Sequence, residues 1–180
     1  FLPFIELFKN RLHIMELKAL KDYRREKLSG KQIYFEPINE FNRKSFDKIW
    51  QSLVVEPTNP FVIRVKGRNV NLARYSNGVA RSSFGDLCGR PLGALDYLTI
   101  CEHIKVLFIE EIPMLSVIGM DSAKRFVTLI DTLYENRIKI VCLAEQTPEL
   151  LYISGKGSFE FERTISRLYE MQGADWIGGM

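Results

Sequence analysis

Histidine and cysteine are scarce in this sequence, which holds two histidines and three cysteines among 180 residues. The cysteines, Cys88, Cys101 and Cys142, show no C-x-x-C spacing. Neither His13 nor His103 stands at ligand spacing from a cysteine. Structural zinc sites and disulfide frameworks both need such groupings. We therefore expect no metal ligands, and we expect core thiols in a reducing compartment.

Long apolar runs and a strong charge of one sign are missing as well. No run approaches the roughly 20 apolar residues that span a bilayer, and no basic region followed by a cleavage site marks a secretory signal. The net charge is only +3, with lysine and arginine spread along the chain. A nucleic-acid binder usually carries a basic patch. We therefore expect no transmembrane segment and no nucleic-acid partner.

The sequence also lacks a Walker A loop, the G-x-x-x-x-G-K-[ST] run whose backbone N–H groups cradle phosphates. Gly-Lys pairs occur at residues 30–31 and 155–156, but neither has the earlier glycine at the required spacing. These residues alone are therefore not expected to hold a triphosphate.

The segment from 105 to 147 organises the rest of the chain. An apolar run at 106–109 precedes a segment with helical spacing at 121–134, and a second apolar run follows at 138–143. Such a pattern predicts a strand, a crossover helix and a parallel strand. The sequence therefore predicts an α/β fold with a doubly wound sheet, whose strands end at one edge. The polar residues expected at that edge are Glu110, Glu111, Glu145 and Gln146.

The flanking segments divide the chain into 1–60, 61–84 and 85–180. Within the first, the spacing of apolar residues predicts a helix at 41–53. Alternation and turn signals in 61–84 predict a small antiparallel β section, which could be a subdomain or an insertion beside the main sheet. A turn is expected at 86–91, and a last helix at 159–171.

Glu110 and Glu111 follow a buried strand in the manner of a Walker B motif. In a nucleotide hydrolase the first acid would hold the Mg²⁺ shell and the second would polarise water. The alternative is an ordinary buried strand that ends in exposed acids.

Three arginines, Arg125, Arg163 and Arg167, are candidates for contact with a phosphoryl group, because guanidinium groups stabilise its charge. The alternative is structural. Arg163 and Arg167 would then form salt bridges, and Arg125 would pair with Asp121 across one helical turn.

Several strings in the sequence resemble landmarks of the ZapE/AFG-one-like P-loop ATPase family, which is related to the AAA+ group. They match it in order and approximate spacing over nearly the whole chain. They are FLPFI at 1–5, DYR at 22–24, LCGRPLGA at 87–94 with DYL at 96–98, IP at 112–113, RFVTLID at 125–131 with LY at 133–134, and FEFERTISRL at 159–168 with EM at 170–171.

The resemblance implies a C-terminal part of an ATPase, because the family's Walker A loop, Walker B strand and sensor strand precede the FLPFI landmark. Residues 1–60 would be the C-terminal portion of the ATPase core and its connecting helices. Residues 61–84 would be an insertion in a three-layer P-loop sheet, and 85–180 the βαβ unit with the C-terminal helix. Glu110 and Glu111 would then end a second, similar strand. ATP and Mg²⁺ would be bound mainly by the upstream half, so we expect these residues alone to be inactive.

The resemblance also implies partners. The bacterial branch is a cytoplasmic cell-division protein associated with the FtsZ ring, and the mitochondrial branch handles respiratory-chain proteins. The short connection between Glu149 and Phe159 favours the bacterial branch. Self-association and peripheral membrane association stay open. Arg125 falls in the family's Arg-Phe motif, and Arg163 and Arg167 fall in its Arg-Thr-x-Ser-Arg motif, so all three are kept as ATP-sensing or intersubunit candidates.

A rival hypothesis is a non-catalytic interaction module. Its binding surface would be an exposed aromatic area around Trp50, Phe61 and Tyr75.

Overall fold

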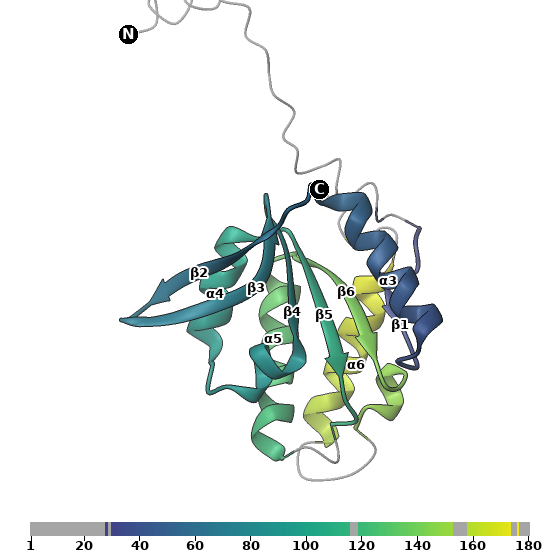
Figure 1. Cartoon of the computed structure of the whole chain (residues 1–180). Coiled ribbons are helices and arrows are strands. Elements are labelled where there is room, and N and C mark those ends of the chain that lie inside the picture. Colours follow the sequence, from purple (N-terminus) through teal and green to yellow (C-terminus); the bar gives the residue numbers. More distant parts are fainter. Residues whose placement is uncertain (1–27, 29, 116–118, 153–157, 174–175, 177–180) are drawn as a thin grey trace, which may run out of the picture.

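A six-stranded mixed sheet forms the middle of the structure (Figure 1). This computed structural model describes residues 28, 30–115, 119–152, 158–173 and 176. The strand order is β1-β6-β5-β4-β3-β2. The strands are β1 (Tyr34–Phe35), β2 (Asn59–Val65), β3 (Arg68–Ser76), β4 (Val79–Ser83), β5 (Val106–Ile112) and β6 (Lys139–Ala144). The helices are α3 (Glu40–Leu53), α4 (Ala94–His103), α5 (Met120–Glu135) and α6 (Ser158–Gln172), with two short helices, η1 (Gly85–Gly89) and η2 (Pro148–Leu150).

Four neighbouring strands, β1, β6, β5 and β4, run parallel. In the centre, Phe108 of β5 pairs with Arg81 of β4 on one side and with Val141 of β6 on the other. The helix α5 links β5 to β6, which confirms the unit predicted for 105–147. The carboxyl ends of these strands therefore meet at one edge of the sheet.

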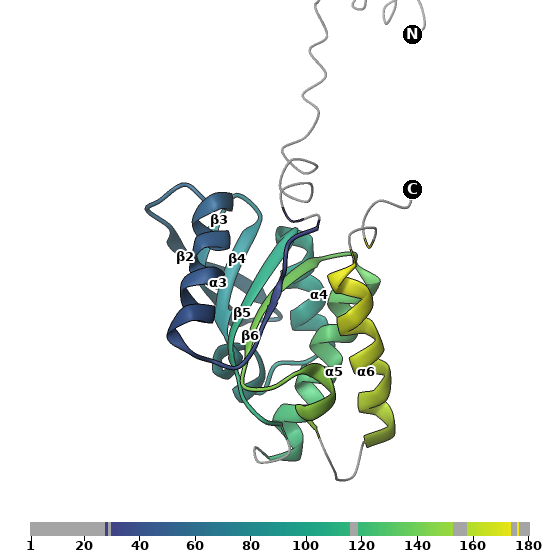
Figure 2. The ribbon, with the colours of Figure 1, turned by 90° about the vertical axis from the view of Figure 1, so that its right-hand side faces the viewer.

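Helices cover both faces of the sheet, with α3 on one face and α4, α5 and α6 on the other (Figure 2). Alternation along the strands explains the two layers, because successive side chains of a strand point to opposite faces. Val106 and Phe108 of β5 pack toward α3, whereas Leu107 and Ile109 pack toward the other helices. The fold is therefore α/β with three layers, as predicted.

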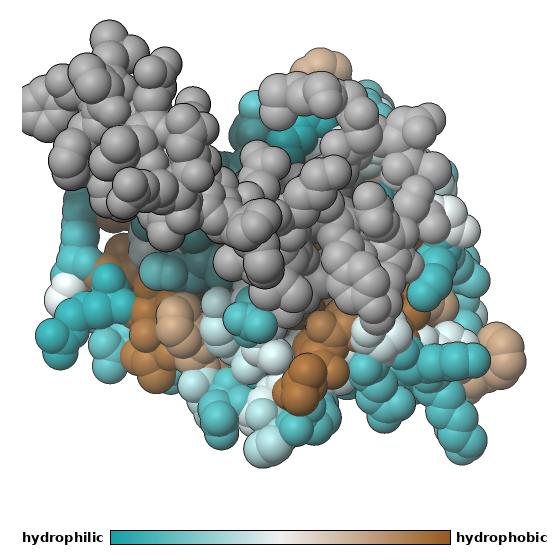
Figure 3. All heavy atoms as spheres, turned by 90° about the horizontal axis from the view of Figure 1, so that it is seen from above, coloured by the Kyte–Doolittle hydropathy of each residue, from teal (hydrophilic) through white to brown (hydrophobic). Residues whose placement is uncertain are grey.

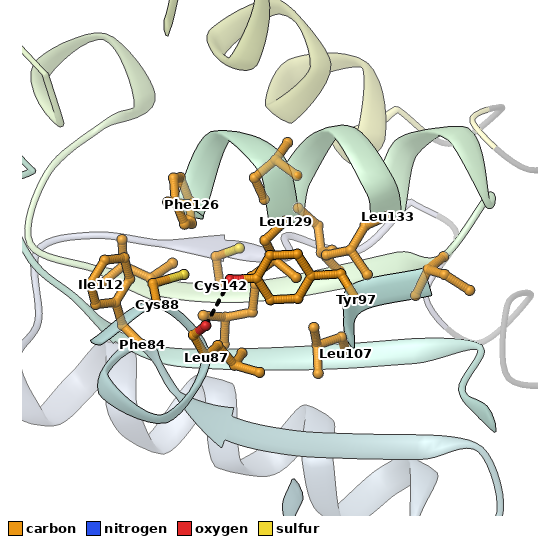
Figure 4. Close-up of a cluster of buried hydrophobic side chains, with 14 of the residues drawn as sticks. Phe84, Leu87, Cys88, Tyr97, Leu107, Ile112, Phe126, Leu129, Leu133 and Cys142 are labelled. Carbon is orange, nitrogen blue, oxygen red and sulfur yellow. Dashed lines mark hydrogen bonds between the residues drawn. The ribbon is translucent and has the colours of Figure 1, made fainter. Parts of the chain in front are cut away.

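The larger of the two cores lies between the sheet and α4, α5 and η1 (Figure 4). The Tyr97 hydroxyl, fully buried here, donates a hydrogen bond to the Leu87 carbonyl at 2.9 Å, so its polar atom is satisfied. Phe126, Leu129 and Leu133 recur at helical spacing on the buried side of α5.

The helix predicted at 41–53 is α3. Its N-cap is Asn39, whose side chain accepts a hydrogen bond from the Asn42 backbone N–H at 2.8 Å. Phe46, Trp50 and Leu53 recur at helical spacing and are buried against the sheet. No glycine or proline interrupts the helix.

Residues 61–84 cover most of β2, all of β3 and β4 and the turns between them, and end one residue after β4. These three strands form the expected antiparallel section, because β3 pairs antiparallel with both β2 and β4. It is part of the main sheet, since β4 also pairs parallel with β5. Asp96 of α4 ties the hairpin to the helical layer, because it accepts hydrogen bonds from Arg68 of β3. The division of the chain at 60/61 and 84/85 stays a prediction.

The turn predicted at 86–91 is wrong in its first part, where residues 85–89 form the π-helix η1. The Ser83 hydroxyl starts this helix, because it accepts a hydrogen bond from the Asp86 N–H at 3.1 Å and donates one to the Asp86 carboxylate at 2.8 Å. The Cys88 carbonyl near its end accepts a hydrogen bond from Arg125. A local contact of Ser83 and a distant contact of Arg125 thus accompany the helix that replaces the expected turn.

Candidate functional site

The two acids at the end of β5, Glu110 and Glu111, both contact residues on the α3 side of the sheet. In a regular strand they would point to opposite faces. The pairing of β5 with β6 shifts between Ile109 and Ile112, and Glu111 has a left-handed backbone with φ 59°. This bulge breaks the alternation and brings both carboxylates to one face.

Arginines of the same chain engage both acids. Arg81 donates to Glu110 through Nε at 2.9 Å and to Asp47 of α3 through Nη1 at 2.6 Å. Arg43 of α3 donates to Glu111 at 2.6 Å. Burial lowers the pKa of Arg81, but its hydrogen bonds to Glu110 and Asp47 outweigh burial, so the pKa lies above its ordinary value. Arg81 therefore stays charged and holds β4, β5 and α3 together.

These contacts decide how well the chain fits Mg²⁺ and ATP. Glu110 and Glu111 already neutralise arginines, and the sequence offers no glycine-lysine phosphate cradle. Within the described ranges, no three His, Cys, Asp or Glu side chains are grouped so that they could hold a metal ion. Within the described ranges, both acids thus form ion pairs with arginines, as the structural interpretation of the acid pair expects.

Glu145 lies at the same edge of the sheet, as predicted. Its carboxylate accepts a hydrogen bond from the Met114 N–H at 2.8 Å, and its own N–H donates to the Ile112 carbonyl at 2.9 Å. The Gln146 carbonyl accepts a hydrogen bond from the Tyr34 hydroxyl at 2.9 Å. These contacts fix the loop after β6 against β1 and the end of β5.

Arg125 is partly buried on α5 beside η1. Its Nε donates to the Cys88 carbonyl at 2.6 Å, and its Nη2 donates to the Ser122 hydroxyl at 3.2 Å. The predicted ion pair with Asp121 does not form, because the guanidinium turns to the π-helix instead. Among the three candidate arginines, Arg125 is the one for which no carboxylate partner is found in the part of the chain that the structure describes.

Arg163 and Arg167 of α6 both reach α5 and bind the same carboxylate. Arg163 Nη2 lies 2.6 Å from Asp131 Oδ2, and Arg167 Nη1 lies 2.5 Å from Asp131 Oδ1. Arg167 also donates to Glu135 at 2.8 Å and covers the ring of Tyr134 at 4.6 Å. The side chain of Arg167 is 16% exposed and that of Arg163 is 57% exposed. Both arginines therefore join α6 to α5, Arg167 from a largely buried position and Arg163 from a more exposed one.

The aromatic surface expected around Trp50 is absent from the described residues, because Trp50 is buried between α3 and the sheet. Its helical spacing with Phe46 and Leu53 places it on the inner side of α3. Phe61 stacks on Tyr75 with ring centroids 4.4 Å apart, and both are partly buried. Where grey atoms do not cover it, the face seen from above in Figure 3 carries separate hydrophobic patches among hydrophilic residues.

The sequence did not single out two aromatic side chains that are largely exposed at the starts of helices. Phe41 is 77% exposed at the start of α3, and Phe159 is 83% exposed at the start of α6. Phe41 lies five residues before Phe46 and Phe159 lies two residues before Phe161, so neither falls on the apolar stripe of its helix, and this offset is the signal that could have identified them.

None of the helices in the described ranges is long and apolar enough to cross a membrane. The cysteines are buried thiols, and burial raises the pKa of Cys88 and of Cys101 to about 12. Neutral, inaccessible thiols are poor nucleophiles and poor metal ligands. The prediction of core thiols is confirmed.

Comparison with known proteins identifies the family. The model of the family described as AFG1-like ATPase matches residues 1–179, so this chain belongs to that family of ATPases. It is 30% identical to Lactation elevated protein 1 homolog B of Danio rerio, with 99% of this chain and 43% of that protein aligned. It is 28% identical to Cell division protein ZapE of Escherichia coli strain K12, with 98% of this chain and 48% of that protein aligned.

The chain thus spans about half the length of these curated relatives. The alignment with the zebrafish protein covers 216 positions, more than this chain has residues, so that relative carries insertions that this chain lacks. The alignment with ZapE covers 178 positions. No solved structure is significantly similar to this chain.

Proposed function

We propose that this chain is the C-terminal part of a cytoplasmic ATP hydrolase that couples hydrolysis to action on a protein partner in cell division. The match of an ATPase family model to residues 1–179 carries the proposal. Under this proposal, a separate half of the protein binds ATP and Mg²⁺, because the sequence of this chain contains no Walker A loop.

Arg125 is the candidate that we favour for contact with the nucleotide. Its guanidinium is oriented by Cys88 and Ser122, and no carboxylate in the described ranges offsets its charge. Fixed, uncompensated positive charge is what stabilises a transferring phosphoryl group. Arg163 and Arg167 fit this role less well, because Asp131 lies between them.

The partner that we propose is FtsZ. One relative is named Cell division protein ZapE. Its alignment with this chain covers 178 positions, whereas the alignment of the zebrafish relative covers 216. Action on respiratory-chain proteins, which the family resemblance implies for its mitochondrial branch, is the alternative. Co-sedimentation with FtsZ polymers tests the choice, and an absence of nucleotide-dependent binding would reject FtsZ.

The hydrolase assignment is tested on the chain expressed from the complete gene. We expect Mg²⁺-dependent ATP hydrolysis that disappears when a Walker A lysine encoded upstream is changed to alanine. The isolated 180 residues should show no turnover above that control. Failure of the complete chain to hydrolyse ATP would contradict the proposal.

A further inference from the structure

The hairpin of β2 and β3 projects from one side of the sheet, and β2 is its outer strand (Figure 1). Val65 and Arg68 flank the two turn residues, 66–67, which both have positive φ. In such a hairpin the flanking residues exchange both backbone hydrogen bonds, and every second residue along the strand does the same. Val62 and Arg64 are the residues between, so their backbone N–H and C=O groups point outward. No further strand lies beside them in the described part of the chain.

The hairpin carries positive charge and no acid of its own. Residues 57–85 contain five Lys or Arg and no Asp or Glu. Three of the five cations form ion pairs with acids of other elements: Arg68 with Asp96, Arg74 with Glu56, and Arg81 with Asp47 and Glu110. The side chains of Arg64 and Lys66 are exposed, and neither has an ion-pair or hydrogen-bond partner among the described residues. The free edge of β2 therefore lies beside two cations whose charge is not offset.

The same edge presents an exposed apolar side chain. Val62 is 53% exposed. Alternation along β2 places its side chain and that of Arg64 together, on the face of the hairpin away from the larger core. Their cross-strand neighbours in β3 are Asn71 and Asn69, which are exposed and uncharged. No acid therefore faces Arg64 across the hairpin.

We propose that the free edge of β2 binds an extended, acidic segment of a partner protein, which adds to the sheet as a further antiparallel strand. A strand added in this way gives the outward N–H and C=O groups of the edge their hydrogen-bond partners. Directly opposed side chains of two strands interact, so the segment presents an apolar residue opposite Val62 and an acid opposite Arg64. The acid and the apolar residue are therefore two positions apart in the segment.

The charge and the backbone of the edge together select this occupant. A second copy of the chain would bring its own Arg64 and Lys66 to the edge, and like charges on paired strands are destabilising. The phosphates of a nucleic acid would offset the two cations, but they only accept hydrogen bonds and leave the outward C=O groups without donors. A peptide strand supplies donors and acceptors alternately, in step with Val62 and Arg64, and its acids offset the charge.

This inference describes the segment that the proposed protein partner presents, and in that respect it rests on the proposed function. Strand addition itself requires no ATP. Loss of hydrolysis and loss of binding at β2 are therefore observed separately.

The test uses the isotope-labelled 180-residue chain at low salt and the peptide Thr-Glu-Thr-Val-Thr-Glu-Thr with blocked termini. When its valine lies opposite Val62, a glutamate lies opposite Arg64. We expect the peptide to shift the backbone amide NMR signals of residues 61–65 saturably, at concentrations up to about millimolar. The amide hydrogens of Val62 and Arg64 should also exchange more slowly with water, because they gain acceptors. A lack of saturable shifts or of slower exchange at these two amides would overturn the proposal.

Three altered peptides separate the contribution of charge from that of the backbone. Glutamine in place of both glutamates should weaken binding by about threefold or more. A methyl group on the valine nitrogen, whose N–H faces β2, should weaken it by about fivefold or more, because a hydrogen bond is lost and the strands are held apart. A methyl group on the nitrogen of the next threonine, whose N–H points away, is the matched control. Equal binding of the glutamine peptide would overturn the acidic occupant, and equal binding of the two methylated peptides would overturn strand addition.

A variant of the chain locates the charge contact. Arg64→Gln should weaken the peptide by about threefold or more. The urea midpoint of unfolding should stay unchanged, because the side chain is exposed. Arg90→Gln removes another exposed arginine, which is paired with Asp86, and should leave binding intact. Unchanged binding by Arg64→Gln would refute the assignment.

The remaining occupants are distinguished by two further measurements. The product of the complete gene should bind the peptide as tightly as the 180-residue chain does. Failure of the complete product to bind would assign the edge to the upstream half of the protein. Sedimentation equilibrium should show the 180-residue chain as a monomer, and a dimer that the peptide dissociates would assign the edge to a second copy. Either of these results would overturn the proposal.

Discussion

Arg81 of β4 and Glu110 of β5 join two neighbouring parallel strands through their side chains, with Arg81 Nε 2.9 Å from Glu110 Oε2. The same guanidinium reaches Asp47 of α3 and lies over the rings of Phe46 and Trp50, at 4.9 Å and 5.9 Å from their centroids. One buried arginine thus connects the sheet to the helix that covers it. An acid that resembles a catalytic residue in the sequence has a structural role here.

Removal of this arginine is expected to destabilise the fold strongly. Arg81→Met should lower the free energy of unfolding by about 3 kcal/mol, because Glu110 and Asp47 then lose their shared partner in a partly buried place. Urea denaturation of the 180-residue chain measures the change. Arg64→Met, on the exposed side of β2, is the control and should stay within about 0.5 kcal/mol. Equal effects of the two substitutions would refute the role of Arg81.

Substitution of Glu111 distinguishes the structural interpretation of the Glu110–Glu111 pair from the catalytic one. Glu111→Gln should leave the ATP turnover of the complete chain within about twofold of the wild type, because the carboxylate binds Arg43 in a half-exposed pair. Loss of a group that stabilises the transition state would lower turnover by about a hundredfold or more. Steady-state hydrolysis assays distinguish these results, and the second one would restore the Walker B hypothesis.

Asp96 should stabilise both the start of α4 and the β2–β3 hairpin. Its carboxylate accepts a hydrogen bond from the Gly93 N–H at 2.8 Å and binds Arg68, although it is fully buried. Asp96→Ala removes both contacts and should cost about 2 kcal/mol in the free energy of unfolding. Thr99→Ala, in the same helix, should cost less than about 0.5 kcal/mol. Thermal unfolding measures both variants, and equal midpoints of unfolding for Asp96→Ala and Thr99→Ala would contradict this role.

The sequence predicted those parts of the fold that depend on local periodicity. The stripe of Phe126, Ile130 and Leu133 identified α5, and the apolar runs identified β5 and β6. The alternation of apolar and polar residues identifies a strand but not the strand that pairs with it. The parallel pairing of β4 with β5 was therefore not evident from the sequence.

The candidate site was harder to predict, because its contacts join residues far apart in the chain. Arg125 was expected to pair with Asp121 at helical spacing, but its partner Cys88 lies 37 residues away on a π-helix. Arg81 was not singled out at all, since its partners lie 29 and 34 residues away. The rival hypothesis of an interaction module placed Trp50 on the surface, although its own helical stripe, with Phe46 and Leu53, indicated burial.

Burial of Lys139 makes the stability of the fold depend on pH, and the sign of this dependence follows from the lowered pKa. Its Nζ donates to the Gly173 carbonyl at 3.2 Å, and burial lowers its pKa below the ordinary 10.5. The folded protein therefore releases this proton at a lower pH than the unfolded chain does, so folding gains stability as the pH rises between the two values. Relative to Lys139→Met, the wild type should become more stable from about pH 7 to about pH 10. Urea denaturation at both pH values tests this, and a difference that does not change with pH would contradict it.

The central claim is that these 180 residues belong to an ATPase and do not themselves hold the nucleotide. Calorimetric titration with Mg²⁺ and a slowly hydrolysed ATP analogue tests it most directly, on the 180-residue chain and on the product of the complete gene. We expect saturable binding by the complete product and none by the 180 residues. Tight binding of the analogue by the 180 residues alone would contradict it.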